Sequence, residues 1–357
     1  MSHQLQVLVV DDSALMRKLI TNLLESDPGV RVVGTASDGV EALQQIAALH
    51  PDVVTLDVEM PRMSGLEALE QIMRDMPLPV VMLSGLSAPE VTLTALELGA
   101  VDFILKPSGT ISVDLYKIRD TLLSKVKIAT FADVTKLARR TSLSSKAMPS
   151  PPTRTYPPSK TNSGAQRLVV IAASTGGPRA LDSLVQKLPG RLAAAVLIVQ
   201  HMPKGFTASL AKRLNGRCEL EVKEAEEGEA IEKNRVYIAP AGHHLLINPI
   251  RASKQAQLHL DNSPPVMGLR PAADLLMESA APIYGPECIG IVLTGMGSDG
   301  TKGIKAIKEH GGQTIVQDRA SSTIYGMPRS AIESGYADQV LPLDEIVPAV
   351  VQLLRQR

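Results

Sequence analysis

The chain begins with a regular alternation of short apolar runs and longer segments in which apolar residues recur with helical spacing. The apolar runs predict strands, and the segments between them predict amphipathic helices. Runs that are apolar at nearly every position predict strands covered on both faces, as in a parallel sheet. The strands are expected at Val7–Val10, Val30–Ala36, Val53–Leu56, Val80–Leu83 and Phe103–Leu105, and the helices at Ala14–Glu25, Val40–Ala48, Leu66–Met73 and Glu90–Leu98. The pattern predicts a doubly wound α/β unit with a five-stranded parallel sheet.

The same alternation returns in the second half of the chain. Strands are expected at Leu168–Ala172, Ala195–Gln200, Val236–Ile238, Ile289–Leu293 and Thr314–Val316, with helices such as Ala180–Lys187 and Gly303–Glu309 between them. This second α/β unit should contain a mostly parallel sheet. The runs between Leu220 and Leu260 are shorter and resemble hairpins, so we expect that sheet to be mixed.

A segment of different composition separates the two halves. From Thr141 to Gln166 the sequence consists largely of Ser, Thr and Pro, with Lys and Arg but no acidic residue. Such a segment cannot bury a core, and its prolines favour extended backbone, so it predicts a semi-flexible linker. The preceding stretch, Ile111–Arg140, is expected to be largely helical and to end near Lys136. The predicted organisation is a first domain at 1–135, a linker at 136–165 and a second domain at 166–357.

Composition narrows the possible functions. Aromatic residues make up only 3 %, and the 37 Lys and Arg residues balance 37 Asp and Glu residues, so neither base stacking nor global charge favours a nucleic-acid partner. Cys218 and Cys288 stand far apart, which predicts reduced thiols rather than a disulfide or a zinc site. No signal peptide is evident, and the longest apolar run, Leu192–Val199, is too short to cross a membrane. We expect a soluble, cytoplasmic protein without membrane insertion.

Polar residues follow four strands of the first predicted sheet. Asp11 and Asp12 follow the first strand, Asp57 the third, Ser84 the fourth and Lys106 the fifth. Open α/β sheets place their ligands at this carboxyl end. Three carboxylates gathered there would repel one another unless a hard divalent cation such as Mg²⁺ binds them. A carboxylate that accepts a phosphoryl group needs such a metal, together with a cation and a hydroxyl group.

The alternative is that these residues only end strands and begin helices. A lone Asp after a strand is usually a turn residue or a helix cap, and Ser13 could simply cap the helix that begins at Ala14. Matching residues after four strands of one sheet favour the phosphoacceptor site.

A second set of residues predicts a serine hydrolase. Ser174 follows the strand Leu168–Ala172 and precedes a helix, in a turn close to the nucleophile-elbow motif. A serine needs a base to become a nucleophile, and His201 follows the next strand. Asp299, in the loop after Ile289–Leu293, is placed to orient that imidazole. All three lie just past strand ends, so one edge of the sheet can gather them.

Each of these three residues also has a simpler interpretation. The glycines after Ser174 could form a phosphate-binding loop, although the GxGxxG pattern is absent. His201 taken alone could be a structural histidine, and His243 and His244 compete with it for the role of base. Asp299 could be a turn or cap residue. No single motif decides between these interpretations.

The first half resembles the receiver domains of two-component response regulators, which have a flavodoxin-like fold. VVDDSALMR, TLDVEMPRMSG and the pair Lys106-Pro107 carry the resemblance, which covers roughly residues 5–125. It implies that Asp57 is phosphorylated by a histidine kinase. It also implies that Asp11 and Asp12 bind Mg²⁺ with Asp57, that Ser84 is the switch hydroxyl and that Lys106 contacts the phosphoryl group.

The second half resembles the CheB family of chemoreceptor protein-glutamate methylesterases. ASTGGP, QHMPKGFT, IAPAGHHL, LTGMGSDGTKG and a later GMP carry this resemblance over about residues 168–345. It implies that Ser174 is the nucleophile, His201 the base and Asp299 its orienting partner in the hydrolysis of glutamate methyl esters, which releases methanol. Deamidation of receptor glutamines is also implied. From their placement, backbone N–H groups of Thr175 and Met296 are candidates for holding the oxyanion.

The two resemblances together predict a phosphorylation-activated enzyme for chemotactic adaptation. Its partners would be methyl-accepting chemoreceptors and a chemotaxis histidine kinase, and it would be recruited to chemoreceptor clusters. Mg²⁺ would serve the receiver, and the esterase step would need no cofactor. We expect the unphosphorylated receiver to cover the esterase site, with phosphorylation shifting the population toward an open form.

Two other functions stay open at this point. One is a non-enzymatic regulator, in which the second domain would only bind a partner. The presence of all three candidate catalytic residues argues against it. A DNA-binding output is the other, but no basic recognition helix follows the linker.

Overall fold

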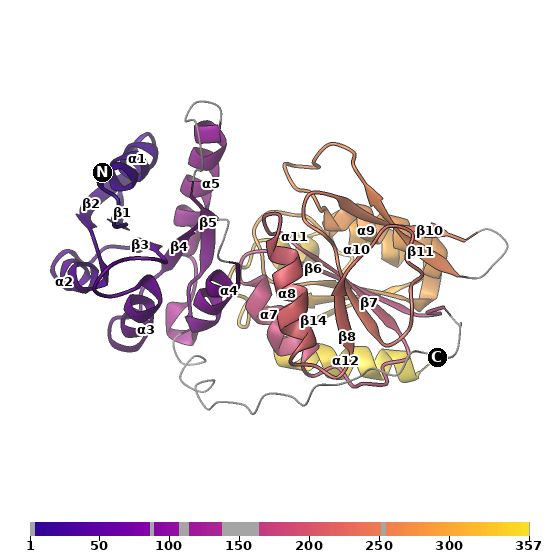
Figure 1. Cartoon of the computed structure of the whole chain (residues 1–357). Coiled ribbons are helices and arrows are strands. Elements are labelled where there is room, and N and C mark those ends of the chain that lie inside the picture. Colours follow the sequence, from indigo (N-terminus) through magenta and orange to yellow (C-terminus); the bar gives the residue numbers. More distant parts are fainter. Residues whose placement is uncertain (1–3, 86–88, 107–113, 138–163, 251–254, 357) are drawn as a thin grey trace. The chain divides into compact units, whose positions relative to one another are not determined.

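The computed structural model describes residues 4–85, 89–106, 114–137, 164–250 and 255–356. The chain divides into two compact units, Met1–Met148 and Pro149–Arg357 (Figure 1). Most of the predicted linker, 136–165, lies outside the described residues, so the linker and the exact domain limits stay predictions.

The first unit is a doubly wound α/β fold, as predicted. Its five strands are ordered β2-β1-β3-β4-β5, and every neighbouring pair is parallel. Helix α1 packs against α5. Helix α2 packs against α3, and α3 packs against α4. The elements are β1 (Leu5–Val10), α1 (Ala14–Glu25), β2 (Val30–Ala36), α2 (Gly39–Leu49), β3 (Val53–Asp57), α3 (Gly65–Asp75), β4 (Val80–Ser84), α4 (Pro89–Leu98), β5 (Asp102–Leu105) and α5 (Asp114–Ala129).

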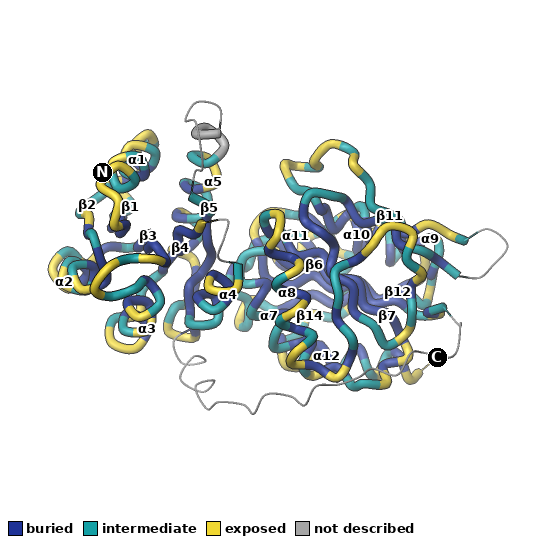
Figure 2. Tube along the Cα trace, viewed as in Figure 1, coloured by how far each residue is buried: buried dark blue, intermediate teal, exposed yellow. Residues whose placement is uncertain are grey.

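The apolar runs form the buried centre of this unit. Every residue of β3 and β4 is buried, and these strands are dark blue along their length in Figure 2. The helices that follow the strands begin at defined caps. Ser64 and Glu67 form a reciprocal capping box at α3, and Ser13 accepts a hydrogen bond from the backbone of Met16 at α1. Strand ends and helix starts therefore coincide at one rim of the sheet.

The described residues 114–137 are largely helical, as predicted, but in two segments. Helix α5 ends at Ala129, a turn follows, and residues 134–137 are helical again. The Asp133 carboxylate accepts hydrogen bonds from the backbone of Lys136 and the hydroxyl of Thr135, so it caps the second helical segment. The expected helical stretch is therefore present among the described residues, with an interruption after Ala129.

The second unit is built on a seven-stranded sheet in the order β14-β13-β12-β6-β7-β9-β8. The elements are β6 (Leu168–Ala173), α7 (Gly177–Val185), β7 (Ala195–Gln200), α8 (Phe206–Asn215), β8 (Glu221–Glu224), β9 (Arg235–Ile238), β10 (His244–Pro249), β11 (Ala256–Asp261), α9 (Ala273–Tyr284), β12 (Cys288–Val292), α10 (Thr301–Glu309), β13 (Gln313–Gln317), α11 (Met327–Glu333), β14 (Gln339–Leu341) and α12 (Leu343–Arg355). Strands β6 and β7 are buried at every position, so they form the centre of the sheet.

The expectation of a mixed sheet was wrong. All neighbouring strands of the seven-stranded sheet are parallel. The hairpin strands β10 and β11 instead pair antiparallel with each other, as a separate two-stranded sheet. Leu245, Ile247 and Leu258 of this hairpin are buried in the same core as α9, and the hydroxyl of Ser279 on α9 accepts a hydrogen bond from the Ile247 backbone. The hairpin thus buries its apolar face on a helix rather than extending the edge of the large sheet.

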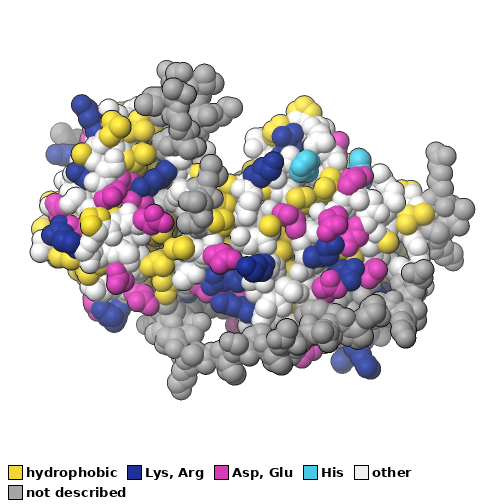
Figure 3. All heavy atoms as spheres, in the orientation of Figure 1, with side chains coloured by type: hydrophobic (Ala, Val, Ile, Leu, Met, Phe, Trp, Pro, Cys, Tyr) yellow, Lys and Arg dark blue, Asp and Glu magenta, His cyan; other side chains and the backbone are white. Residues whose placement is uncertain are grey.

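Basic and acidic side chains intermingle over the face of each unit seen in Figure 3, without a large area of one sign. This agrees with the equal numbers of the two charge types, 37 each. Within the described residues, no helix combines the length and apolar character needed to cross a membrane.

Candidate active site and phosphoacceptor site

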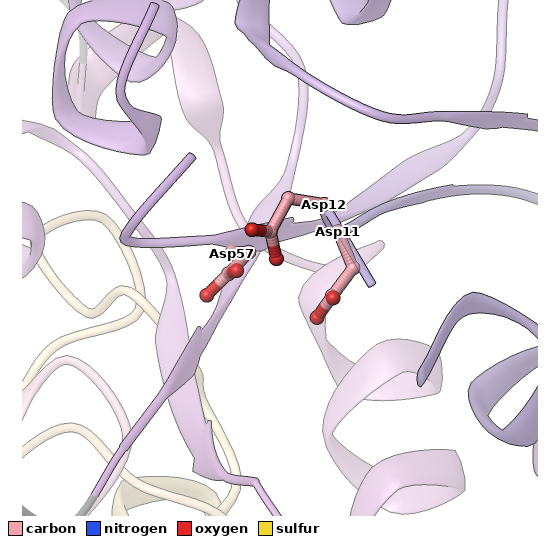
Figure 4. A group of neighbouring side chains, drawn as sticks. All are labelled: Asp11, Asp12 and Asp57. Atoms are coloured by element: carbon pink, nitrogen blue, oxygen red, sulfur yellow. The ribbon is translucent and has the colours of Figure 1, made fainter. Parts of the chain in front are cut away.

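The three acidic residues of the first unit meet at the carboxyl end of its sheet. Asp11 and Asp12 follow β1, and Asp57 ends β3; because β1 and β3 pair in parallel, these ends lie side by side. One carboxylate oxygen from each residue lies within 4.8 Å of the others (Figure 4). Asp11 and Asp57 are buried and Asp12 is exposed. Three carboxylates converging in this way fit the oxygen ligands that Mg²⁺ prefers.

Lys106 balances the charge of this cluster. Its ammonium nitrogen lies 2.8 Å from an Asp11 oxygen and 2.6 Å from an Asp57 oxygen. Burial raises the pKa of Asp57 to about 6, against the opposing effect of Lys106. Burial also disfavours the charged form of Lys106, but its two carboxylate partners outweigh burial and raise its pKa. The site therefore holds a carboxylate and a fixed ammonium group side by side.

Ser84 lies at the end of β4, close to this site. Its hydroxyl is buried and lies 2.6 Å from the hydroxyl of Thr92 on α4. Its carbonyl accepts a hydrogen bond from the backbone of Lys106 at 2.8 Å, which ties the ends of β4 and β5 together. Thr92 was not predicted, because a threonine within a helix carries no motif. Ser13 caps α1, as the simpler interpretation held.

Ser174 occupies the predicted strand–turn–helix in the second unit. Strand β6 ends at Ala173 and α7 begins at Gly177, three residues earlier than predicted. Gly176 has a φ of 77°, and a Cβ there would also lie 2.5 Å from Thr323, so the turn requires glycine. The Ser174 backbone donates to the carbonyl of Thr294 at 3.1 Å, which joins this turn to the loop after β12.

His201 is the first residue after β7, the strand that pairs in parallel with β6. Its Nε2 lies 2.7 Å from Oδ2 of Asp299. Its Nδ1 is buried and has no hydrogen-bond partner among the described residues. When Nε2–H donates to the carboxylate, Nδ1 carries the lone pair and is the atom able to accept a proton.

Asp299 is buried and accepts several hydrogen bonds besides that of His201. The backbone N–H groups of Ala273 and Asp274, at the start of α9, donate to it at 2.7 and 2.9 Å, and that of Gly300 donates at 3.1 Å. Burial opposes ionisation of Asp299, but the bond from His201 and the two from α9 outweigh it and lower its pKa. The carboxylate is therefore ionised and fixed in orientation, as a group that orients an imidazole must be.

A second buried acid supports Asp299, and sequence reasoning did not find it. Asp274 lies in the first turn of α9, and its Oδ1 accepts hydrogen bonds at 2.8 Å from the backbones of Gly300 and Gly303 at the start of α10. Asp299 thus caps the start of α9, and Asp274 caps the start of α10. Burial raises the pKa of Asp274 to about 6. No sequence signal pointed to it, because Ala273–Tyr284 was not among the helices expected.

The competing histidines are placed differently from His201. His244 is fully buried; its Nδ1 accepts from the backbone of Ala272 and its Nε2 contacts the carbonyl of Pro264, both at 3.2 Å. The Nδ1 of His243 is buried without a hydrogen-bond partner within the described part of the chain, whereas His201 contacts a carboxylate through its Nε2. Of the three histidines, His201 therefore has the geometry of an oriented base.

The two candidate oxyanion residues lie on the loops that frame Ser174. Thr175 directly follows Ser174, and its carbonyl accepts from the Thr294 hydroxyl at 3.0 Å. Met296 lies on the loop after β12, and its side chain is 46 % exposed. On the same loop, a Cβ at Gly295 would lie 2.7 Å from the Ser174 Cβ. The role of the two N–H groups stays a prediction.

Comparisons with known proteins match both units of the chain. The model of the CheB methylesterase family matches residues 169–350, and that of the response regulator receiver domain matches residues 7–114. The solved CheB methylesterase catalytic domain of Thermotoga maritima is 46 % identical and superimposes with a TM-score of 0.51, covering 54 % of this chain and 99 % of that one.

Relatives match along nearly the whole chain. A protein-glutamate methylesterase/protein-glutamine glutaminase of Geobacillus kaustophilus is 49 % identical over 358 residues, which cover 98 % of this chain and 99 % of the relative. A protein of the same name from Pyrococcus horikoshii is 45 % identical over 360 residues, covering 99 % of this chain and 94 % of the relative. The chain therefore belongs to the CheB methylesterase family, in the form that carries an N-terminal response regulator receiver domain.

Proposed function

We propose that the protein is a phosphorylation-activated protein-glutamate methylesterase that acts on chemoreceptors, and that it also deamidates receptor glutamines. The observation that carries this proposal is the buried pair of His201 and Asp299, 2.7 Å apart, on the sheet edge that also carries the Ser174 turn. Nearly full-length similarity to proteins named for these two activities supports the choice of substrate.

In the acylation step, His201 Nδ1 takes the Ser174 proton as the hydroxyl attacks the ester carbonyl. Asp299 holds the ring through Nε2 and stabilises the imidazolium that forms. The oxyanion would accept hydrogen bonds from the backbone N–H groups of Thr175 and Met296. The imidazolium then protonates the leaving methoxide, and methanol departs.

In the second step, His201 activates a water molecule that cleaves the acyl-enzyme and regenerates Ser174. The same sequence with a glutamine side chain releases ammonia instead of methanol, and both substrates end as glutamate. In both steps the proton moves through His201, and both His201 and Ser174 belong to the second unit.

We propose that Asp57 is the phosphoacceptor and that a chemotaxis histidine kinase is its phosphodonor. Asp11, Asp12 and Asp57 would hold Mg²⁺, which when bound neutralises charge on the phosphoryl oxygens. Lys106 would hold a further phosphoryl oxygen through its ammonium group, and Ser84 would supply a hydroxyl. Phosphorylation then raises esterase activity, in the cytoplasm and at chemoreceptor clusters.

A fluorophosphonate probe, which labels activated serines, separates this proposal from a partner-binding regulator without enzymatic activity. The proposal expects one labelled peptide, containing Ser174, and no labelling of the Ser174→Ala variant. An unlabelled wild-type protein that still binds chemoreceptors would support the non-enzymatic alternative.

A further inference from the structure

Gln200 is the last residue of β7, directly before His201, and none of the roles above uses its side chain. It is buried, with a relative exposure of 1 %. Its amide nitrogen donates to the carbonyl of Ser174 at 3.0 Å and to the carbonyl of His201 at 3.1 Å. One amide group therefore joins the backbone of the candidate nucleophile to that of the candidate base.

The orientation of this amide follows from its partners. Both contacts are carbonyl oxygens, so the NH₂ end must face them. The opposite end, Oε1, is buried without a hydrogen-bond partner among the described residues. It packs against Gly177, where a Cβ would lie only 2.0 Å away. A buried acceptor without a hydrogen-bond partner lowers the stability of the folded state. The two hydrogen bonds of the NH₂ group offset that cost.

We propose that Gln200 is a positioning residue that sets the distance between the Ser174 turn and the His201 turn. This inference rests on the proposed esterase function. The Ser174 carbonyl also accepts from Gly177 at 2.7 Å, and the Ser174 N–H donates to Thr294 at 3.1 Å. The turn is thus held from α7, from the loop after β12 and, through Gln200, from β7. The His201 N–H donates to the carbonyl of Ala173, directly before Ser174, at 3.1 Å, and the Gln200 amide adds a side-chain connection between the same two turns.

The consequence for catalysis is geometric. Proton transfer from Ser174 to His201 needs the two side chains within hydrogen-bonding reach. A displacement of about 1 Å in such an arrangement lowers the rate by roughly 100-fold. Substrate binding depends on other groups, so loss of the Gln200 bonds should lower kcat and leave KM nearly unchanged.

The test compares Gln200→Met with Thr314→Val in the full-length protein. Methionine keeps the length of the side chain and removes both donors. Thr314 is also fully buried, and its hydroxyl bonds to Tyr336 and Asp338 near the opposite, amino-terminal end of β13. Thr314→Val therefore removes a buried hydrogen-bonding group at similar cost to stability but far along the strand from the site.

Three quantities are measured for each variant: kcat and KM for methanol release, the second-order rate constant of fluorophosphonate labelling at Ser174, and the Tm. For Gln200→Met we expect kcat and the labelling rate to fall together by roughly 10- to 100-fold, with KM within about twofold of wild type. For Thr314→Val we expect both rates within about twofold of wild type, with a comparable loss in Tm.

Equal rates for Gln200→Met and Thr314→Val would overturn the positioning role. If the methionine variant does not fold, Gln200→Glu provides the test, since it keeps the size but presents only acceptors to the two carbonyl oxygens at neutral pH. A labelling rate for the glutamate variant equal to that of wild type would overturn the inference as well. Failure of wild type itself to label would instead reject the proposed esterase, so the two failures are distinguishable.

Discussion

Replacement of Asp299 by Asn tests the orientation of the His201 base. The carboxylate accepts four hydrogen bonds. His201 Nε2 and the Ala273 N–H donate to one oxygen, and the N–H groups of Asp274 and Gly300 donate to the other. An asparagine has one acceptor oxygen, so in either orientation its NH₂ group faces two donors. If that NH₂ faces His201, it favours the tautomer with hydrogen on Nδ1, which cannot accept a proton from Ser174.

The size of the effect follows from these contacts. In a well-characterised serine protease triad, the equivalent substitution lowers kcat by about 10⁴-fold through the wrong tautomer. We expect a fall of the order of 10³- to 10⁴-fold here, which corresponds to about 4–5.5 kcal/mol of transition-state stabilisation. Each buried donor left without a partner also costs about 1–3 kcal/mol of folding free energy, so the second unit should unfold at a lower temperature.

The assay is methanol release from methylated receptor membranes, with the amount of folded enzyme fixed by circular dichroism. Asp338→Asn is the control, because Asp338 likewise accepts from several donors, the N–H and hydroxyl groups of Thr314 and the ammonium group of Lys308, near the amino-terminal end of β13. That variant should keep the wild-type kcat. A kcat for Asp299→Asn within tenfold of the control would refute the role assigned to the carboxylate.

The remaining predictions concern the nucleophile, the metal and one buried acid. Ser174→Ala should abolish methanol release and leave the Tm within 1–2 °C of wild type, by differential scanning calorimetry, because the half-buried hydroxyl fills no core cavity. EDTA should abolish stimulation by a phosphodonor and leave basal methanol release intact, since the acidic cluster Asp11, Asp12 and Asp57 lies on the receiver; loss of basal release on chelation would put a metal requirement in the esterase. The pKa of Asp274 is raised from 3.8 to about 6 in the folded state, so the folded protein binds this proton more tightly than the unfolded chain does. Lowering the pH from 7 to 5 should therefore increase the unfolding free energy of wild type by about 1.4 kcal/mol more than that of Asp274→Asn. Identical pH profiles of urea unfolding for the two proteins would contradict this prediction.

The parts of the fold that were predicted are those with a continuous apolar signal. Strands β3 and β6 are buried throughout and read as unbroken apolar runs. Strand β8, Glu221–Glu224, was not predicted, because three of its four residues are charged and it lies at the edge of the sheet. The hairpin was anticipated, but periodicity gives the presence of a strand and not the sheet it joins. Its pairing depends on the apolar surface that α9 offers, which is a tertiary property.

The candidate site divides in the same way. Ser174, His201 and Asp299 each follow a strand within a recognisable motif, so their convergence could be anticipated from topology. Asp274 and Gln200 could not, because they bond to backbone atoms, including those of segments remote in sequence. A backbone partner leaves no pattern of side-chain types along the chain, and only the folded structure reveals it.

The most direct test of a phosphorylation-controlled serine esterase is methanol release from membranes that carry methylated chemoreceptors, measured with and without a small-molecule phosphodonor in the presence of Mg²⁺. Wild type should release methanol and accelerate with the phosphodonor, and Asp57→Asn should keep the basal rate without acceleration, because an amide cannot become an acyl phosphate. Ser174→Ala should release none under either condition. Methanol release by Ser174→Ala at the wild-type rate, or acceleration of Asp57→Asn equal to that of wild type, would contradict the account.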